Sequence, residues 1–211
     1  MIYDLTPPIT SATKVWPGDT PLSREMVCEI EKGATVTLSA IRATVHLGAH
    51  ADGPNHYTPS GQGIGERPLH YYLGRCHVVQ APGTRGRRVG IDDIGGTTGI
   101  GRLTAKRVLI RTDSFPDPTD WNTDFAGLEP SLVDALHEKG VVTIGVDTPS
   151  VDTQDSKDLP AHNAFRRHDM AILEGLTLKD VPLGLYELIA LPLRLIGFDA
   201  SPVRAVLRTL D

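Results

Sequence analysis

A helix followed at once by an almost wholly apolar strand constrains the fold of this 211-residue chain more than any other feature. The segment PSLVDALHEKG (130–140) has a proline at its first position, apolar residues on one helical face, and a glycine as a stop. The segment VVTIGVD (141–147) follows directly. Apolar strands of this kind are buried on both faces, in sheets that helices cover. The pair therefore predicts an α/β fold.

The rest of the chain predicts further strands and helices and shows no boundary between domains. We expect strands at CHVVQA (76–81) and RVLIRT (107–112) and a short helix at AHNAFRRHD (161–169). We also expect a strand at YELIALPLRLIG (186–197), interrupted by Pro192. No internal repeat, low-complexity tract or linker separates these segments. We therefore expect residues 1–211 to form a single domain with a mixed sheet.

The segment TLSAIRATVHL (37–47) alternates apolar and polar residues. A period of two predicts a half-buried strand. In this interpretation, His46 is the last outward-facing residue before a glycine loop.

Composition excludes several classes of function. The formal net charge of -5 argues against a nucleic-acid partner, and we expect the arginines of GTRGRRVG (83–90) to lie in a solvated loop. The glycine-rich segment 95–101 lacks the GK[ST] of a phosphate-binding loop. No signal peptide or membrane-spanning run is evident. Cys28 and Cys76 form no CxxC pair, so we expect small core side chains in a cytoplasmic protein.

The segment HLGAHADGPNH (46–56) gathers three of the chain's eight histidines and one aspartate. Metalloprotease helices also place two histidines four residues apart, as His46 and His50 are. Here, Gly48 lies between the two, Gly53 and Pro54 follow, and no glutamate succeeds His46, so a helix is excluded. Glycine allows the bends that would turn His46, His50 and Asp52 inward.

Imidazole and carboxylate groups together form a ligand set for Zn²⁺, and also for Mn²⁺ or Fe²⁺. No cysteine lies near the cluster, which argues against a closed structural zinc site. Three ligands without a thiolate are typical of a catalytic centre with an open position. The alternative is a metal-binding centre without catalysis. His56 argues against it, because this histidine is additional to the three ligands and is available for proton transfer.

A second candidate segment lies downstream, where His162 and Glu174 are twelve residues apart. On one continuous helix these residues would not share a face. They can converge if the helix stops near Asp169 and the run MAIL forms a short strand that ends at Glu174. His168 competes with His162 as a ligand, and spacing does not decide between them.

At this point the residues resemble a known family. The cyclase-like metal hydrolases carry the motif H-x-G-[TA]-H-x-D-x-P-x-H, which His46–His56 satisfies with Ala49 in a place that is more often threonine. The resemblance is to the bacterial kynurenine formamidases (arylformamidases) of that family, and it covers most of the chain. The segments that carry it are DLTPPITSATKVWPGDTP (4–21), GVDTPSVD (145–152), HNAFRRHDMAILEGL (162–176) and YELIALPLRLIGFDASPVRAVLR (186–208).

The resemblance implies a site, a fold and an assembly. It implies two divalent metal ions, zinc or alternatively manganese, one bound by His46, His50 and Asp52 and the other by Asp52, His162 and Glu174. It makes His56 the acid–base residue and Trp16 a substrate contact. It also implies a homodimer of swivelling β/β/α-type α/β subunits that hydrolyses N-formyl-L-kynurenine, a small molecule, to L-kynurenine and formate. Another amide or lactone as substrate is the alternative.

Two further residues have open roles. Asp147 ends the expected buried strand, and we expect a supporting or structural residue there and not a ligand. Tyr57 follows His56 and could line the substrate pocket. We expect His70, His77 and His137 to lie in a loop, a strand and a helix C-terminus.

Overall fold

The computed structural model of the protein describes residues 1–94 and 99–210. Its strands are β1 (Ile2–Asp4), β2 (Ser23–Cys28), β3 (Leu38–Arg42), β4 (His50–Asp52), β5 (Leu73–Gln80), β6 (Arg88–Val89), β7 (Arg107–Arg111), β8 (Gly127–Leu128), β9 (Thr143–Val146), β10 (Ala171–Glu174), β11 (Gly184–Ile189), β12 (Ala200–Pro202) and β13 (Val206–Thr209). Its α-helices are α1 (Pro130–Glu138) and α2 (Pro160–Arg167), and short 3₁₀ helices lie between several of these elements. Most of the glycine-rich segment 95–101, discussed above for its lack of a phosphate-binding motif, lies outside the described residues.

The main sheet is mixed. Among the described residues it has nine strands in the order β1-β13-β11-β5-β7-β9-β10-β4-β12. The central neighbours β5, β7, β9 and β10 run parallel, and every other pair is antiparallel. This arrangement confirms the α/β prediction, and the predicted strands at 76–81, 107–112 and 141–147 all lie in the parallel centre.

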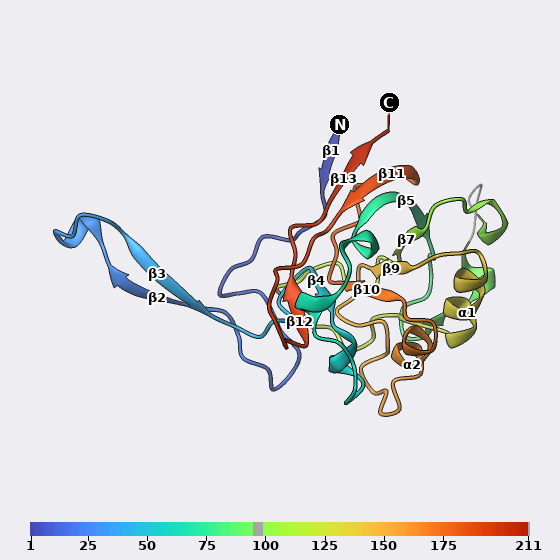
Figure 1. Ribbon diagram of the computed structural model, residues 1–211, viewed down its shortest axis with the longest axis horizontal. Coiled ribbons are helices and arrows are strands. Elements are labelled where there is room, and N and C mark those ends of the chain that lie inside the picture. The colour runs from blue at the N-terminus through green and yellow to red at the C-terminus, as the bar shows by residue number, and fades with distance from the viewer. Residues whose placement is uncertain (95–98, 211) are drawn as a thin grey trace.

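Two hydrophobic clusters cover the two faces of this sheet. Alternate residues of one strand enter opposite clusters: Val108 and Ile110 of β7 pack with the residues of α1 and α2, whereas Leu109 packs on the other face. The helices α1 and α2 pack side by side over the first face (Figure 1). Burial on both faces is the reason that these strands are apolar almost throughout.

The prediction for residues 37–47 is wrong in extent and in burial. The strand β3 ends at Arg42, and all five of its residues are exposed. It pairs with β2 in a two-stranded ribbon that extends away from the body of the protein (Figure 1). The alternation of residues in this segment therefore reflects a ribbon with two open faces, not a sheet with one face on the core.

Two smaller predictions also need correction. The predicted strand at 186–197 ends at Ile189, so the residues around Pro192 run outside the sheet. Cys76 is buried in the core, as expected, but Cys28 lies on the exposed ribbon. Both cysteines are free.

The described residues contain no helix that is long and apolar enough to cross a membrane.

Candidate metal centre and substrate cavity

The register between two short strands, β4 and β10, brings their polar residues together. In β4, His50 and Asp52 are two residues apart and therefore point to the same face. His50 pairs directly with Glu174, the last residue of β10, so their side chains also share a face. All three residues are buried, with exposed fractions of 2–3%. The HAD segment is thus a strand and not part of a loop, in contrast to our expectation.

A contact between two glycines permits this pairing. Gly48 and Gly175 both have positive φ angles, of 60° and 65°. A Cβ atom on Gly175 would lie 2.2 Å from the carbonyl oxygen of Gly48. Side chains at this point would push the loop before β4 away from the end of β10, and the carboxylate of Glu174 would separate from His50.

His46 and His162 complete the cluster from two other segments. His46 Nδ1 lies 3.2 Å from one carboxylate oxygen of Asp52, Oδ1, and His162 Nε2 lies 3.5 Å from the other, Oδ2. His162 is on α2 and is buried. His168, its rival from the sequence, lies after the end of α2 and pairs with Asp134 at 2.7 Å.

The central atoms of this cluster lack hydrogen bonds. Asp52 Oδ1, Asp52 Oδ2 and His50 Nε2 are buried and have no hydrogen-bond partner among the described residues. His50 Nε2 lies only 3.5 Å from Asp52 Oδ1 and 3.2 Å from Glu174 Oε2. Unpaired buried groups are costly, and a cation between nitrogen and carboxylate donors would satisfy them. The residues therefore fit a bound divalent metal.

Hydrogen bonds from the outer ring nitrogens fix how the histidines face the cluster. His50 Nδ1 donates to the Gly48 carbonyl at 2.9 Å, which leaves Nε2 free toward the cluster. His162 Nδ1 lies 2.7 Å from Asp152 Oδ2, and Arg88 in turn donates to Asp152 Oδ1 at 2.6 Å. A carboxylate behind a ligating histidine orients the ring and increases its basicity. Arg88 is therefore tied to this cluster and is not a solvated loop residue.

We expect Asp152→Asn to weaken metal binding by about 10–100-fold, because the ring of His162 would lose the carboxylate that orients it. Competition with a metal-sensitive dye would measure the affinity. Asp124→Asn is a matched control, since Asp124 pairs with Arg85 at an exposed site. Equal metal affinity in the Asp152→Asn variant and the wild type would contradict the orienting role.

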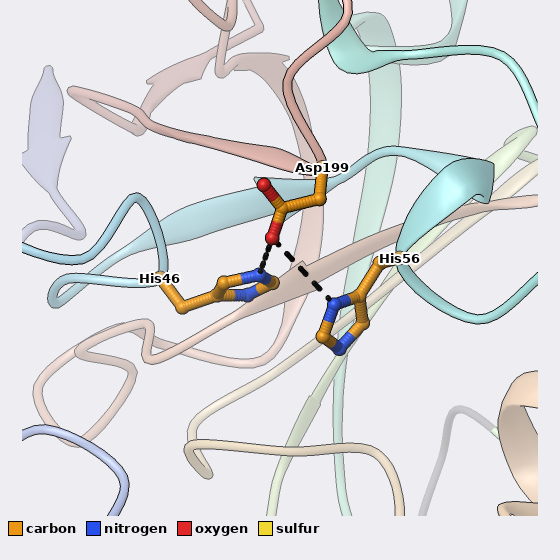
Figure 2. A group of neighbouring side chains, drawn as sticks. All are labelled: His46, His56 and Asp199. Atoms are coloured by element: carbon orange, nitrogen blue, oxygen red, sulfur yellow. Dashed lines mark hydrogen bonds and ion pairs between the residues drawn. The ribbon is translucent and has the colours of Figure 1, made fainter. Parts of the chain in front are cut away.

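His56 and Asp199 lie on the solvent side of the cluster. His56 ends a 3₁₀ turn (Pro54–His56), and its side chain is 37% exposed. Asp199 Oδ2 lies 3.0 Å from His46 Nε2 and 3.8 Å from His56 Nδ1, and Figure 2 shows Asp199 between the two rings. By distance alone, His56 could also act as a ligand with Asp52 and His162.

Sequence reasoning missed Asp199 and Asp152. Both lie in segments that carry the family resemblance, but no spacing rule connects either to the histidines. The only available signal was a lone acidic residue beside an apolar strand in GFDASPVRAVLR (197–208). Asp199 reaches the site because it immediately precedes β12, which pairs with β4.

A cavity of about 420 Å³ opens over the cluster. This volume is within the range of ligand pockets, about 300–1,000 Å³. Its walls carry aromatic residues, among them Trp16 and Trp121, whose rings meet edge to face at 5.7 Å. His46, His50, His56, His162 and Glu174 lie at the same cavity.

Asp147 and Tyr57 have different positions. Asp147 lines the cavity, but its buried carboxylate accepts hydrogen bonds from the backbone and hydroxyl of Thr112 and the backbone of Asp113. It therefore braces the loop after β7. Tyr57 is not among the described residues that line the cavity; its ring packs 5.2 Å from that of His162.

Carboxylates raise the proton affinity of two histidines in the metal-free chain. Burial opposes the positive charge on His46, but Asp52 and Asp199 outweigh it and raise the pKa to about 9. Burial likewise opposes the charge on His162, yet Asp152 and Asp52 raise its pKa to about 10. For His56, burial dominates and lowers the pKa below the usual value. His46 and His162 are therefore protonated at neutral pH, and His56 is neutral.

We expect metal binding to release protons at pH 7, because imidazolium cannot ligate a cation and His46 and His162 titrate only near 9 and 10. The apparent affinity should accordingly rise with pH across the accessible range of about 6–8. Calorimetric titration of metal in buffers of different ionisation enthalpy would count the protons. Heats that do not change with the buffer would contradict this expectation.

The fold and the cluster together define a class: an α/β protein with buried histidine and carboxylate side chains arranged for metal binding beside a substrate-sized cavity. Residues 3–153 match the sequence profile of the family described as putative cyclase. Because the match spans well over half of the chain, this protein belongs to the cyclase family.

Solved structures agree with this membership. A potential metal-dependent hydrolase with cyclase activity is 27% identical, with a TM-score of 0.80, and the alignment covers 98% of this chain and 96% of that one. A predicted metal-dependent hydrolase from Bacillus stearothermophilus is 28% identical, with a TM-score of 0.79 and coverage of 98% and 97%. Isatin hydrolase A from Labrenzia aggregata, bound to benzyl benzoate, shares the fold at 22% identity, a TM-score of 0.82 and coverage of 100% and 94%. The fold is thus that of metal-dependent hydrolases.

Proposed function

We propose that this protein hydrolyses N-formyl-L-kynurenine to L-kynurenine and formate. The observation that carries a hydrolytic function is a set of buried atoms of Asp52 and His50 that lack a partner among the described residues, with His50 lining an aromatic cavity. The choice of substrate rests on the resemblance of segments 4–21, 145–152, 162–176 and 186–208 to kynurenine formamidases.

The metal ligands in this proposal are those that the resemblance implies. His46, His50 and Asp52 would hold one divalent cation, and Asp52, His162 and Glu174 a second, with zinc the first choice and manganese the other. When bound, such cations supply Lewis-acid stabilisation of charge on the amide oxygen and lower the pKa of water toward neutrality.

The chain's own residues perform the proton transfer and the positioning. His56 is neutral and faces the cavity, so its imidazole can take the proton of the attacking water and return it to the departing aryl nitrogen. Asp199 lies beside His56, with its Oδ2 3.8 Å from Nδ1 of the ring. Trp16 offers a flat apolar surface to the aryl ring of the substrate.

Turnover of N-formyl-L-kynurenine by metal-loaded protein tests the proposal. We expect release of kynurenine and formate, loss of activity after chelation, and recovery after zinc or manganese is added back. No turnover by protein with full metal content would refute the proposal.

The structures of isatin hydrolases favour a second candidate, hydrolysis of a cyclic amide or a lactone. Two of them share the fold with TM-scores of 0.82. A panel of isatin, lactones and N-formyl-L-kynurenine under identical conditions separates the candidates. A kcat/KM for isatin that exceeds the value for N-formyl-L-kynurenine would select the second.

We also propose that the protein is a homodimer in the cytoplasm, with two free cysteines in keeping with that compartment. The ribbon of β2 and β3 supports the dimer. It exposes the apolar side chains of Met26, Leu38 and Ile41. The register between β2 and β3 places Met26 and Ile41 on one face of the ribbon and Leu38 on the other. A two-stranded ribbon with apolar groups on both faces is marginal alone and gains stability between the surfaces of a second copy.

The surface area supports the same assembly. The chain exposes 10677 Å². A compact monomer of 22.8 kDa exposes roughly 9,600 Å². The excess of roughly 1,100 Å² is slightly more than the ~600–1,000 Å² that one partner buries in a standard interface, so the protruding ribbon offers enough surface for one.

We expect Ile41→Asp combined with Leu38→Asp to convert the dimer to a monomer, because charge on both faces of the ribbon opposes its burial. Size-exclusion chromatography with light scattering would measure the mass. Leu69→Asp is the matched control, since Leu69 is 57% exposed but lies outside the ribbon. A wild-type protein that is monomeric at micromolar concentration would contradict the dimer.

A further inference from the structure

Two lysines lie at the cavity that holds the metal cluster. Lys14 and Lys179 both line it, and both are exposed. Among the described residues, neither ammonium group has a carboxylate within ion-pair distance. The chain has only six lysines, and two of them line this one cavity.

The backbone positions of both lysines are held in place. The amide of Lys14 donates at 2.8 Å to the carbonyl of Pro118, which also lines the cavity. The carbonyl of Lys179 accepts from Arg111 Nη1 at 3.2 Å. Lys14 is two residues before Trp16, and Lys179 is five residues after Glu174, with every residue between lining the cavity. Lys14 thus lies on the same stretch of wall as Trp16, and Lys179 on the stretch that begins at Glu174.

Among the described residues, the acidic groups at the same cavity all lie beyond ion-pair distance of both ammonium groups; they are those of Asp19, Asp113, Asp147, Glu174 and Asp199. Asp19 accepts a hydrogen bond from the hydroxyl of Thr44 at 3.1 Å, and Asp113 lies 3.5 Å from Nε of Arg111. An anionic group that enters the cavity would therefore meet Lys14 and Lys179 as its free cationic partners. Two ammonium groups donate well to one carboxylate.

We propose that Lys14 and Lys179 bind the free carboxylate of the substrate, so that the cavity selects aryl amides that carry an amino-acid side arm. This inference deepens the proposed function and rests on it. The metal cluster would lie at the amide end, the aromatic wall along the ring, and the lysines at the carboxylate end. A neutral aryl formamide would lack the third contact.

Binding of the product separates the lysine contact from catalysis. We expect L-kynurenine to bind metal-loaded protein about tenfold or more tightly than its methyl ester, measured by calorimetry. Lys14→Met and Lys179→Met should each weaken binding of L-kynurenine by about tenfold and leave binding of the ester unchanged. Lys106→Met is the matched control, because Lys106 is exposed and is not a lining residue.

The outcomes distinguish the two proposals. An ester that binds as tightly as the acid, no binding of either, or equal losses for acid and ester in the lysine variants would each overturn the role of the lysines. Turnover of N-formyl-L-kynurenine and of N-formyl-2-aminoacetophenone, which lacks the amino-acid arm, tests the reaction separately. Failure to hydrolyse both refutes the proposed reaction, whereas equal kcat/KM values for both refute only carboxylate recognition.

Discussion

Replacement of His56 by alanine is expected to lower kcat by about 10²–10⁴-fold with metal content unchanged. The imidazole faces the cavity and, with burial lowering its pKa, is neutral at pH 7 and able to accept a proton. Without it, proton transfer from the attacking water and to the aryl nitrogen must rely on solvent. Steady-state kinetics with elemental analysis of the same sample would measure both effects.

Metal content decides between two roles of His56. A variant that loses activity and also loses metal would identify His56 as a ligand, since its ring lies within ligand distance of Asp52 and His162. His137→Ala is the control, because His137 stacks on His168 at the end of α1, away from the cavity. Full activity in His56→Ala would exclude an acid–base role.

Replacement of Asp52 by asparagine is expected to abolish metal retention and turnover together. Asp52 lies at the centre of the cluster, with His46 and His50 near Oδ1 and His162 near Oδ2. Asparagine keeps the shape of the side chain but provides only one oxygen and no charge. Both predicted metal positions use this carboxylate, so one substitution should empty both.

The thermal response to metal provides the measurement for Asp52. A cation that binds only the folded state raises Tm, by an amount that grows with its concentration. We expect this rise in the wild type and not in Asp52→Asn, while Asp134→Asn, at an exposed pair with Arg167, should respond as the wild type does. A wild-type shift in Asp52→Asn would place the bound cation elsewhere.

Those parts of the fold that rest on local pattern could be predicted from the sequence. The helix at 130–140 and the strand at 141–147 were predictable because burial on both faces requires an apolar strand, and Pro130 and Gly140 mark the helix ends. The turn from α2 to β10 was predictable from Glu174, which could approach His162 only if the helix stopped. These inferences need no knowledge of distant contacts.

The parts that depend on pairing between distant segments could not be predicted. The segment His50–Asp52 is a strand only because β10 and β12 lie on either side of it. Asp199 enters the site through the same pairing, and nothing local to it indicates a partner. The ribbon of β2 and β3 carries an alternation that is equally typical of a half-buried strand, and only its surroundings distinguish the two.

The position of β4 between β10 and β12 also has a consequence during synthesis of the chain. A ribosome that has released residues 1–175 has already delivered all five predicted ligands, yet β12 (Ala200–Pro202) is still missing. One edge of β4 then lacks its partner, and pairing between segments so distant in sequence forms slowly. Metal capture should therefore follow release of the last strands, so a nascent chain that stalls late would carry every ligand and no stable site.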